Sequence, residues 1–245
     1  MNFIQKHVSK SALVLSLMLA LCVLIAISSS PEPKHLFALR QLLEHVLPEN
    51  NSYQNMHRNV EWKGSHNATK YACHTDCCGL LDSVLIHSYH YTRQDLKKWL
   101  GQSRPRASTY YKAIFNNHGF EHIINIHNVL PGDVIALCYP PGLKSNGHIM
   151  FVNALPEQIA SSAPIIENTK QWAVPIIDCT GACHGPQDTR HLSNGQHSSG
   201  IGKGIFRIYT DNNGNIVGYS WAIEASSEFH GEDMRKIAIG RLLRT

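Results

Sequence analysis

The chain has 245 residues, of which 43% are hydrophobic and 16% are charged, with a formal net charge of +4. The charged fraction lies below the roughly 25% of typical globular proteins, which excludes a highly charged disordered chain and a coiled coil. Only one long apolar run is present, so a polytopic membrane protein is excluded, and the length allows a sizeable core. Lysine and arginine form no run of about five or more, so no nucleic-acid partner is expected.

Residues 1–30 have the pattern of an export segment. Lys6 and Lys10 precede an apolar run over 12–27, and small residues follow at 28–30. The run is shorter than the ~20 residues that a spanning helix normally needs. We therefore expect a cleaved signal peptide, with an uncleaved N-terminal anchor as the rival. Both predict an exported protein that is periplasmic, in the cell envelope or secreted, with membrane contact only through an uncleaved N-terminal segment.

The next part of the chain is expected to be helical. Apolar spacing over 36–47 predicts a short helix and the Asn-rich stretch 49–59 predicts a loop, so residues 31–60 are assigned to a leading helix and loop. Further helices are predicted in three places, two of them behind a capping residue: 79–89 with Asp76 as the cap, 92–100 with Thr92 as the cap, and 109–117.

The chain changes to strand patterns in its second half. Short apolar segments follow turn-forming residues at 133–139, 148–152, 173–178, 204–210 and 215–223, and the last two are predicted to form a hairpin. Residues 235–243 fit either a strand or a helix. Helices followed by strands predict an α+β domain, in which N-terminal helices pack on an antiparallel sheet of about five or six strands.

Three segments carry residues whose chemistry would be complementary. Cys77 stands at the start of a helix, where the dipole favours a thiolate, and His148 opens a strand. An imidazole beside the thiol completes its activation and later returns a proton to the leaving amine. Asp178, at the end of the next predicted strand, would orient the far ring nitrogen. We therefore predict Cys77, His148 and Asp178 as catalytic residues, with the N–H groups around Cys77 and Cys78 facing the oxyanion.

These segments resemble the NlpC-type cell-wall peptidases, a papain-like family of cysteine peptidases. The family has Asp-Cys-Ser-Gly before an aromatic residue or Leu at the start of its first core helix, and residues 76–80 read Asp-Cys-Cys-Gly-Leu. It has a Leu-x-Pro-Gly-Asp turn before the next strand, and residues 129–133 read Val-Leu-Pro-Gly-Asp. The resemblance places the nucleophile at Cys77, the base at His148 and the third, polar position at Asp178.

The resemblance implies that residues 61–245 form a papain-like, NlpC-type catalytic domain. It also implies hydrolysis of an amide in peptidoglycan, usually a γ-D-glutamyl link to a diamino acid in the stem peptide, with no metal or organic cofactor. The chain departs from the family in three respects. Cys78 replaces the Ser, the aromatic-Gly-Gly stretch before the nucleophile is not recognisable, and the segment 155–171 is longer than expected between adjacent strands.

The cysteines leave two other functions open. After export six cysteines remain, and in an oxidising compartment they could pair as disulfides. The main alternative is therefore a non-catalytic, disulfide-stabilised cell-envelope binding protein that keeps the fold. A second alternative is a secreted amidase or acyltransferase that acts on a substrate outside the cell wall. Within the enzymatic interpretation, Cys78 competes with Cys77 as the nucleophile.

Two further patterns could in principle bind a ligand, a zinc ion in one case and a phosphate in the other, but neither is assigned as a binding site. Cysteines 73, 77, 179 and 183 have a spacing permitted for structural zinc, but such thiols tend to oxidise after export, so no metal ligand is assigned. The glycine-rich stretch Gly200–Gly204 leads into a strand, whereas a phosphate cradle needs a helix N-terminus. We therefore expect this stretch to be a loop beside the cleft.

Overall fold

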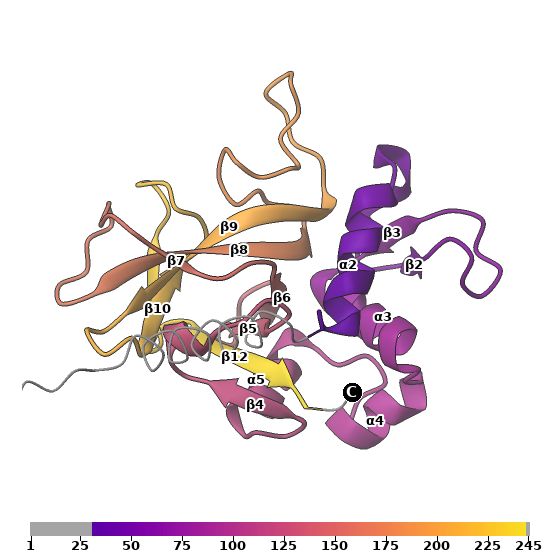
Figure 1. The fold of residues 1–245 in the computed structure, drawn as a ribbon, viewed down its shortest axis with the longest axis horizontal. Coiled ribbons are helices and arrows are strands. Elements are labelled where there is room, and N and C mark those ends of the chain that lie inside the picture. Colours follow the sequence, from indigo (N-terminus) through magenta and orange to yellow (C-terminus); the bar gives the residue numbers. More distant parts are fainter. Residues whose placement is uncertain (1–30, 244–245) are drawn as a thin grey trace, which may run out of the picture. The chain divides into compact units, whose positions relative to one another are not determined.

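A computed structural model describes residues 31–243 of the chain (Figure 1). The predicted export segment, 1–30, lies outside the described residues. From Pro33 onward the chain forms one compact unit. None of the helices within residues 31–243 combines the length and the apolar character that crossing a membrane requires.

The fold is α+β, as the order of helices and strands predicts. The described α-helices are α2 (Lys34–His45), α3 (Cys77–Tyr89), α4 (Arg93–Leu100) and α5 (Ala107–Phe115). Both predicted capping residues cap their helices. The Asp76 side chain accepts a hydrogen bond from the N–H of Gly79 at the start of α3, and Thr92 forms a reciprocal capping box with Asp95 at the start of α4.

A nine-stranded antiparallel sheet forms the centre of the unit. Its strands are β4 (Phe120–Ile123), β5 (Val134–Cys138), β6 (Gly147–Val152), β7 (Glu157–Ile159), β8 (Lys170–Thr180), β9 (Gly200–Thr210), β10 (Ile216–Ser220), β11 (Phe229–Gly231) and β12 (Lys236–Leu242). The strand order is β11-β10-β9-β8-β6-β5-β12-β4, and β7 pairs with β8.

The expectation of five or six strands was wrong, because the sheet is larger. Five predicted strands are present as β5, β6, β8, β9 and β10, and the ambiguous segment 235–243 contains β12. The three additional strands, β4, β7 and β11, have only three or four residues each. Segments this short are too brief to show a clear alternation of polar and apolar residues, so they join the sheet through backbone pairing that sequence patterns do not reveal.

A second, three-stranded sheet begins within the segment 49–59, which was expected to be a loop. It has the order β1-β3-β2 and consists of β1 (Asn51–Tyr53), β2 (Asn59–Glu61) and β3 (Ala72–Thr75). Strand β1 is parallel to β3, and β2 is antiparallel to it. The polar, Asn-rich sequence of β1 and β2 gives little sign of strands, because these edge strands are not buried.

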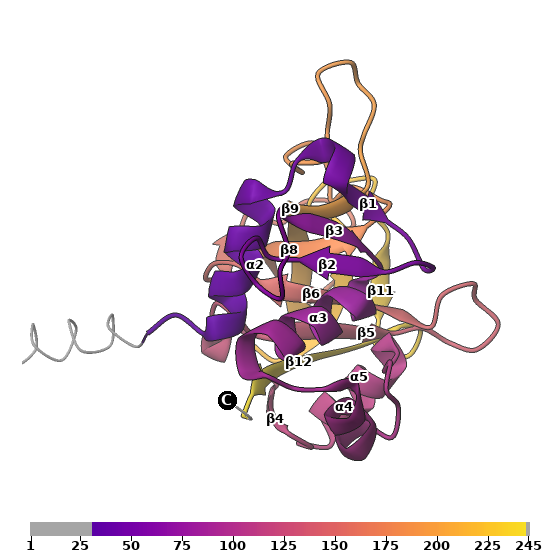
Figure 2. The same ribbon diagram turned by 90° about the vertical axis from the view of Figure 1, so that its right-hand side faces the viewer.

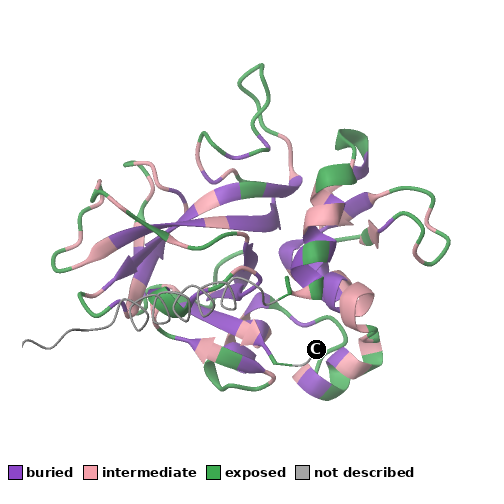
Figure 3. Cartoon of the chain, viewed as in Figure 1, coloured by how far each residue is buried: buried purple, intermediate pink, exposed green. Residues whose placement is uncertain are grey.

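Both faces of the large sheet are apolar, and each carries its own hydrophobic cluster. Along β5, Val134 and Ala136 belong to the cluster shared with the helices, whereas Ile135 and Leu137 belong to a cluster on the opposite face. Figure 2 shows α2, α3 and the small sheet in front of the first face. Figure 3 shows the strands as mostly buried. The candidate site involves both faces, because Cys77 belongs to the first cluster whereas His148 pairs with Leu137 of the second.

Candidate active site

The start of α3 lies at a point where two neighbouring strands of the large sheet separate. Strands β6 and β8 pair only from Met150 opposite Asp178 to Val152 opposite Ile176. Beyond Met150, β6 continues to Gly147 beside β5, while β8 continues to Thr180 beside β9. Helix α3 contacts both β6 and β8. The first residue of α3, Cys77, therefore stands between the residues that open β6 and those that end β8.

Close packing holds the start of α3 in this place. A Cβ atom at Gly79 would lie 2.1 Å from Thr75 Oγ1 at the end of β3, so only glycine fits there. The N–H of Gly79 bonds Asp76 Oδ1, and the N–H of Leu80 bonds the Asp76 carbonyl. The N–H groups of Cys77 and Cys78 are thus the two first-turn donors without an acceptor inside the helix. They are the donors that an oxyanion beside Cys77 would meet.

The three predicted catalytic residues come together. His148 Nε2 lies 2.6 Å from Asp178 Oδ2, and both residues are buried. The Cys77 thiol and His148 also interact, since each is among the causes of the other's pKa shift, and the backbone N–H of Ile149 contributes to the shift of Cys77. Because Nε2 is engaged by Asp178, Nδ1 is the nitrogen that serves the thiol. The side chains thus form a continuous series from sulfur to imidazole to carboxylate.

The electrostatics of the pair favour a thiolate and an imidazolium. The pKa of the Cys77 thiol is held well below its usual value, first by the hydrogen bond from the Cys78 thiol and then by the His148 charge, although burial opposes both. Burial would lower the pKa of His148, but the Cys77 thiolate and Asp178 outweigh it and raise that pKa to about 10. Both shifts are therefore in the direction that favours the charged forms of the pair.

Cys78 has the opposite character, which favours Cys77 over Cys78 as the candidate nucleophile. Its Sγ atom lies 3.9 Å from that of Cys77, and its pKa is raised well above the usual value because its proton bonds Cys77 and because it is buried. His148 is among the main causes of the shift for Cys77 but not for Cys78. The imidazole therefore favours Cys77 as the candidate nucleophile, with Cys78 beside it.

Sequence reasoning missed two residues that complete the surroundings of Asp178. His184 Nε2 lies 3.0 Å from Asp178 Oδ2, and its Nδ1 lies 2.7 Å from the Trp221 carbonyl oxygen. Both neighbours are oxygen acceptors, so the two ring nitrogens of His184 each face a hydrogen-bond acceptor. Arg190 Nη1 forms an ion pair with Asp178 Oδ1 at 2.8 Å, but the two atoms are not aligned for a hydrogen bond.

The two missed residues share a third partner. The carboxylate of Asp188 accepts two hydrogen bonds from the Arg190 guanidinium, at 2.8 and 2.7 Å, and one from the His184 backbone N–H. Burial would raise the pKa of Asp178, but the charges of His184 and Arg190 hold it well below its usual value. Asp178 is therefore a fixed anion that faces His148.

Glycines in β9 were the sequence signal for this arrangement. The stretch Gly200–Gly204 is part of β9, so the expectation of a loop there was wrong. A Cβ atom at Gly202 would lie 2.8 Å from Arg190 Nε, and one at Gly204 would lie 2.6 Å from His184 Cβ. Alternate glycines on one face of this strand make room for the segment that holds Asp178.

The same side chains raise the question of a metal ion. Within residues 31–243, the group of donor atoms close enough to share an ion is His148, Asp178 and His184, and it contains no cysteine. Ligands of a tetrahedral zinc ion with bonds of about 2.0–2.1 Å stand roughly 3.3 Å apart. The His148–Asp178 distance of 2.6 Å is shorter, and Arg190 occupies the other carboxylate oxygen. The spacing and charge therefore fit hydrogen bonds better than metal ligation.

The cysteines in the described part of the chain form no disulfide bonds with one another. All six cysteines of the described part of the chain are free thiols: Cys73, Cys77, Cys78, Cys138, Cys179 and Cys183. Cys179 is buried and its thiol donates to the Thr75 carbonyl oxygen at 3.2 Å. The sulfur of Cys77 is thus available for chemistry.

Aromatic side chains lie near the predicted catalytic residues. The Trp221 ring stacks on His184 with centroids 4.1 Å apart and meets the His148 ring edge-on at 5.0 Å. Tyr53 comes from the small sheet, and its pKa is raised first by burial and then by the charge of Cys77.

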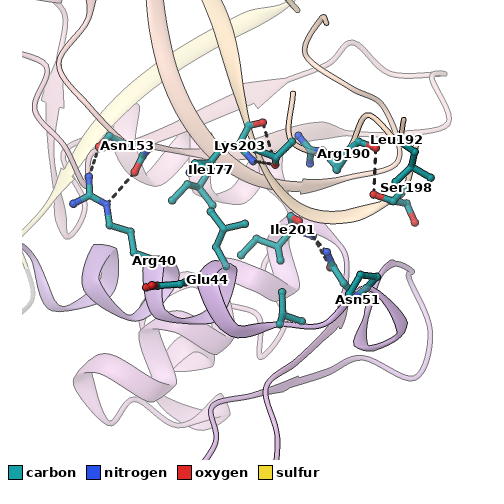
Figure 4. A pocket seen from close by; sticks show the side chains of 15 residues that line it. Arg40, Glu44, Asn51, Asn153, Ile177, Arg190, Leu192, Ser198, Ile201 and Lys203 are labelled. Carbon is teal, nitrogen blue, oxygen red and sulfur yellow. Dashed lines mark hydrogen bonds between the residues drawn. The ribbon is translucent and has the colours of Figure 1, made fainter. Parts of the chain in front are cut away.

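A groove of about 710 Å³ lies between α2 and the strands β8 and β9, on the other side of β8 (Figure 4). It contains none of Cys77, His148 and Asp178, and it shares only Arg190 with the candidate site. Arg40 and Asn153 hydrogen-bond to each other across one of its ends. We therefore do not assign the chemistry to this groove.

Comparisons with known proteins give the family of the chain but not its activity. No family model and no solved structure matches it. An uncharacterized protein of Acanthamoeba polyphaga mimivirus is 36% identical over 223 residues, which cover 87% of this chain and 98% of the relative. Similarity of this extent spans nearly the whole of the viral protein. The chain therefore belongs to the same family as this mimivirus protein.

Proposed function

We propose that the protein is an exported cysteine hydrolase that cleaves an amide bond with Cys77, His148 and Asp178. The proposal depends on one observation: His148 lies 2.6 Å from Asp178, and His148 and the Cys77 thiol favour each other's charged forms. The charges in this series fit a nucleophile, a base and an orienting anion. These are the three parts that thiol-based acyl transfer requires.

The positions of these residues on the helices and strands also support a papain-like fold. The nucleophile opens a helix that packs on an antiparallel sheet, and the histidine opens a strand of that sheet. Asp178 stands on the next strand, directly opposite Met150. The order Cys, Pro-Gly-Asp turn, His and polar residue is the one through which the sequence resembles the NlpC-type peptidases.

The reaction follows from these positions. The Cys77 thiolate attacks the carbonyl carbon, and the resulting oxyanion faces the N–H groups of Cys77 and Cys78. His148 gives its Nδ1 proton to the leaving amine as the C–N bond breaks, which leaves an acyl thioester. His148 then takes a proton from water, and the hydroxide releases the acid and restores the thiolate. Asp178 keeps the ring oriented throughout.

The substrate that we propose is a peptidoglycan stem peptide, reached outside the cytoplasm. Support comes from the resemblance to cell-wall peptidases and from the apolar segment at residues 12–27. The free thiol of Cys77 favours this proposal over a binding protein in which that sulfur is tied up in a disulfide.

Hydrolysis of purified muropeptides by matched cysteine variants tests the proposal. We expect Cys77→Ala to abolish turnover and to leave folding nearly intact, because the side chain is small. The adjacent variant Cys78→Ala should keep turnover, reduced because it loses the donor to Cys77. Full activity in Cys77→Ala, with loss in Cys78→Ala, would contradict the assignment of the nucleophile.

A further inference from the structure

A half-buried arginine stands near the catalytic histidine on the same face of the large sheet. His148 pairs directly with Leu137 of β5, so the two side chains share a face. Tyr139 lies two residues further along the chain and packs on the same apolar cluster as Leu137. The guanidinium carbon of Arg235, just before β12, lies 4.8 Å from the centre of the Tyr139 ring. β12 is two strand spacings from β6, or about 10 Å.

The charges of Cys77 and Arg235 both act on the Tyr139 side chain. Burial raises the pKa of Tyr139, the Arg235 cation lowers it, and the charge of Cys77 raises it. The Tyr139 ring, which lies against the guanidinium, is thus also within reach of the Cys77 charge. A molecule bound at Cys77 and extending past Tyr139 would meet Arg235.

Arg235 has no anionic partner of its own. Among residues 31–243, its guanidinium forms no ion pair with any carboxylate. By contrast, Arg58, Arg93, Arg190 and Arg241 all pair with aspartates. A partly buried cation without a counter-ion is costly, and a bound anion removes that cost.

One buried polar atom near Arg235 also lacks a partner. His230 Nδ1 has no hydrogen bond within the described residues, although the His230 side chain is more than nine-tenths buried. Tyr219 and His230 face each other across β10 and β11, with ring centroids 5.4 Å apart. Arg235 acts electrostatically on both side chains. A buried polar atom is rarely left unsatisfied, so a ligand group is expected to complete His230.

We propose that Arg235, Tyr139, Tyr219 and His230 form a subsite for a carboxylate of the substrate, next to the Cys77 nucleophile. A guanidinium presents a planar fork of donors that matches a carboxylate, and the Tyr219 hydroxyl adds a further donor. This inference rests on the proposed hydrolase function and deepens it, because it restricts the substrate to amides that carry an anionic group near the scissile bond.

Binding to the inactive full-length protein tests the subsite without catalysis. The probes are two stem-type peptides with a γ-D-glutamyl residue, one with a free α-carboxylate and one with an α-carboxamide. Calorimetry with Cys77→Ala should give a dissociation constant about tenfold lower for the carboxylate, as a charge-assisted hydrogen bond predicts. Equal affinities for the two peptides would refute the subsite, whether or not the wild-type protein hydrolyses them.

Substitution of the arginine in the same background identifies the cation. In Cys77→Ala with Arg235→Gln, the preference for the carboxylate should disappear. The matched variant Lys170→Gln removes one charge at the opposite end of β8 and should keep the preference. A preference that survives Arg235→Gln would overturn the assignment of Arg235. If Arg235→Gln fails to fold, the peptide pair alone still decides whether a carboxylate is recognised.

The two proposals fail in different ways. A protein that prefers the carboxylate through Arg235 but shows no turnover with wild-type Cys77 keeps the subsite and refutes the hydrolase. A protein that hydrolyses both peptides with equal affinity and rate keeps the hydrolase and refutes the subsite.

Discussion

At the scale of single residues, the candidate site is an arrangement of compensated charges. Asp178 is buried and faces three donors: His148, His184 and Arg190. An isolated buried carboxylate would take up a proton, but these neighbours keep it ionised. Its charge is one of the reasons why the pKa of His148 is raised, so the effect of Asp178 should be visible in the pH dependence of turnover.

Asp178→Asn should shift the alkaline limit of the activity profile. The wild-type imidazolium is expected to lose its proton near pH 10, and removal of the carboxylate takes away part of the support for its charge. We expect the alkaline limb of kcat/KM to move to lower pH. The change also leaves His184 and Arg190 without their anion, which should cost about 3–5 kcal/mol of stability. A pH–rate profile of the folded variant measures the shift.

Asp211→Asn is the matched control for this experiment. Asp211 is not buried within the core and accepts hydrogen bonds in the turn between β9 and β10, at the end of β9 remote from Asp178. This variant should keep the alkaline limb of the wild-type protein. An unchanged limb in Asp178→Asn would show that the carboxylate does not act on His148.

At the scale of elements, a buried histidine fastens α2 to the rest of the fold. His35 Nε2 donates to the Gly132 carbonyl oxygen at 2.7 Å, and its Nδ1 accepts from the Tyr89 hydroxyl at 2.7 Å. The contacts join α2 to the turn before β5 and to the end of α3. One ring nitrogen acts as a donor and the other as an acceptor, so the neutral imidazole is the form that fits.

His35 should make the stability of the fold depend on pH. Burial is the main reason why its pKa is lowered from 6.5 in the folded chain. As the pH falls, His35 is therefore protonated in the unfolded chain before it is protonated in the folded chain. The stability that its neutral form contributes is fully present above pH 6.5 and is lost as the pH falls from 6.5 through the folded pKa. His35→Phe should show a shallower loss of stability below pH 6.5, by up to about 1.4 kcal/mol per pH unit. Denaturant unfolding at a series of pH values measures both slopes.

His45→Phe provides the control on the same helix. His45 is exposed, its ring donates to the Gln41 carbonyl oxygen one turn earlier in α2, and it stacks on Tyr71. Other buried histidines contribute to the pH dependence of both proteins, so the difference between the two variants isolates His35. Identical slopes in His35→Phe and His45→Phe would remove His35 as the source.

At the scale of the whole molecule, the sequence predicts the α+β class and the elements that have clear signals. Asp76 and Thr92 mark helix starts because capping needs only local contacts. The position of Cys77 at the start of a helix and of His148 at the start of a strand follow from the same local patterns. The sheet size did not follow, because β4, β7 and β11 are too short to show a period of their own.

Long-range contacts explain what the sequence did not reveal at the site. His184 and Arg190 lie six and twelve residues after Asp178, in a segment without regular structure between β8 and β9. Their role depends on a chain reversal that brings them back beside Asp178. Gly202 and Gly204 were the local sequence signal of this chain reversal, because they leave room for Arg190 and His184. A stretch with several glycines is, however, more easily interpreted as a loop.

The described unit should fold without the segment that precedes it. Both hydrophobic clusters are built from residues between Leu36 and Leu242 within the described part of the chain. A chain that begins at Pro31 keeps all of α2 and should unfold cooperatively, with a free energy of unfolding within about 0.5 kcal/mol of the full-length protein. A chain that begins at Arg40 loses Leu36 and Leu39 from the core and should be destabilised by several kcal/mol. Denaturant unfolding of the three proteins measures this, and a non-cooperative transition in the Pro31 chain would show that the unit needs residues 1–30.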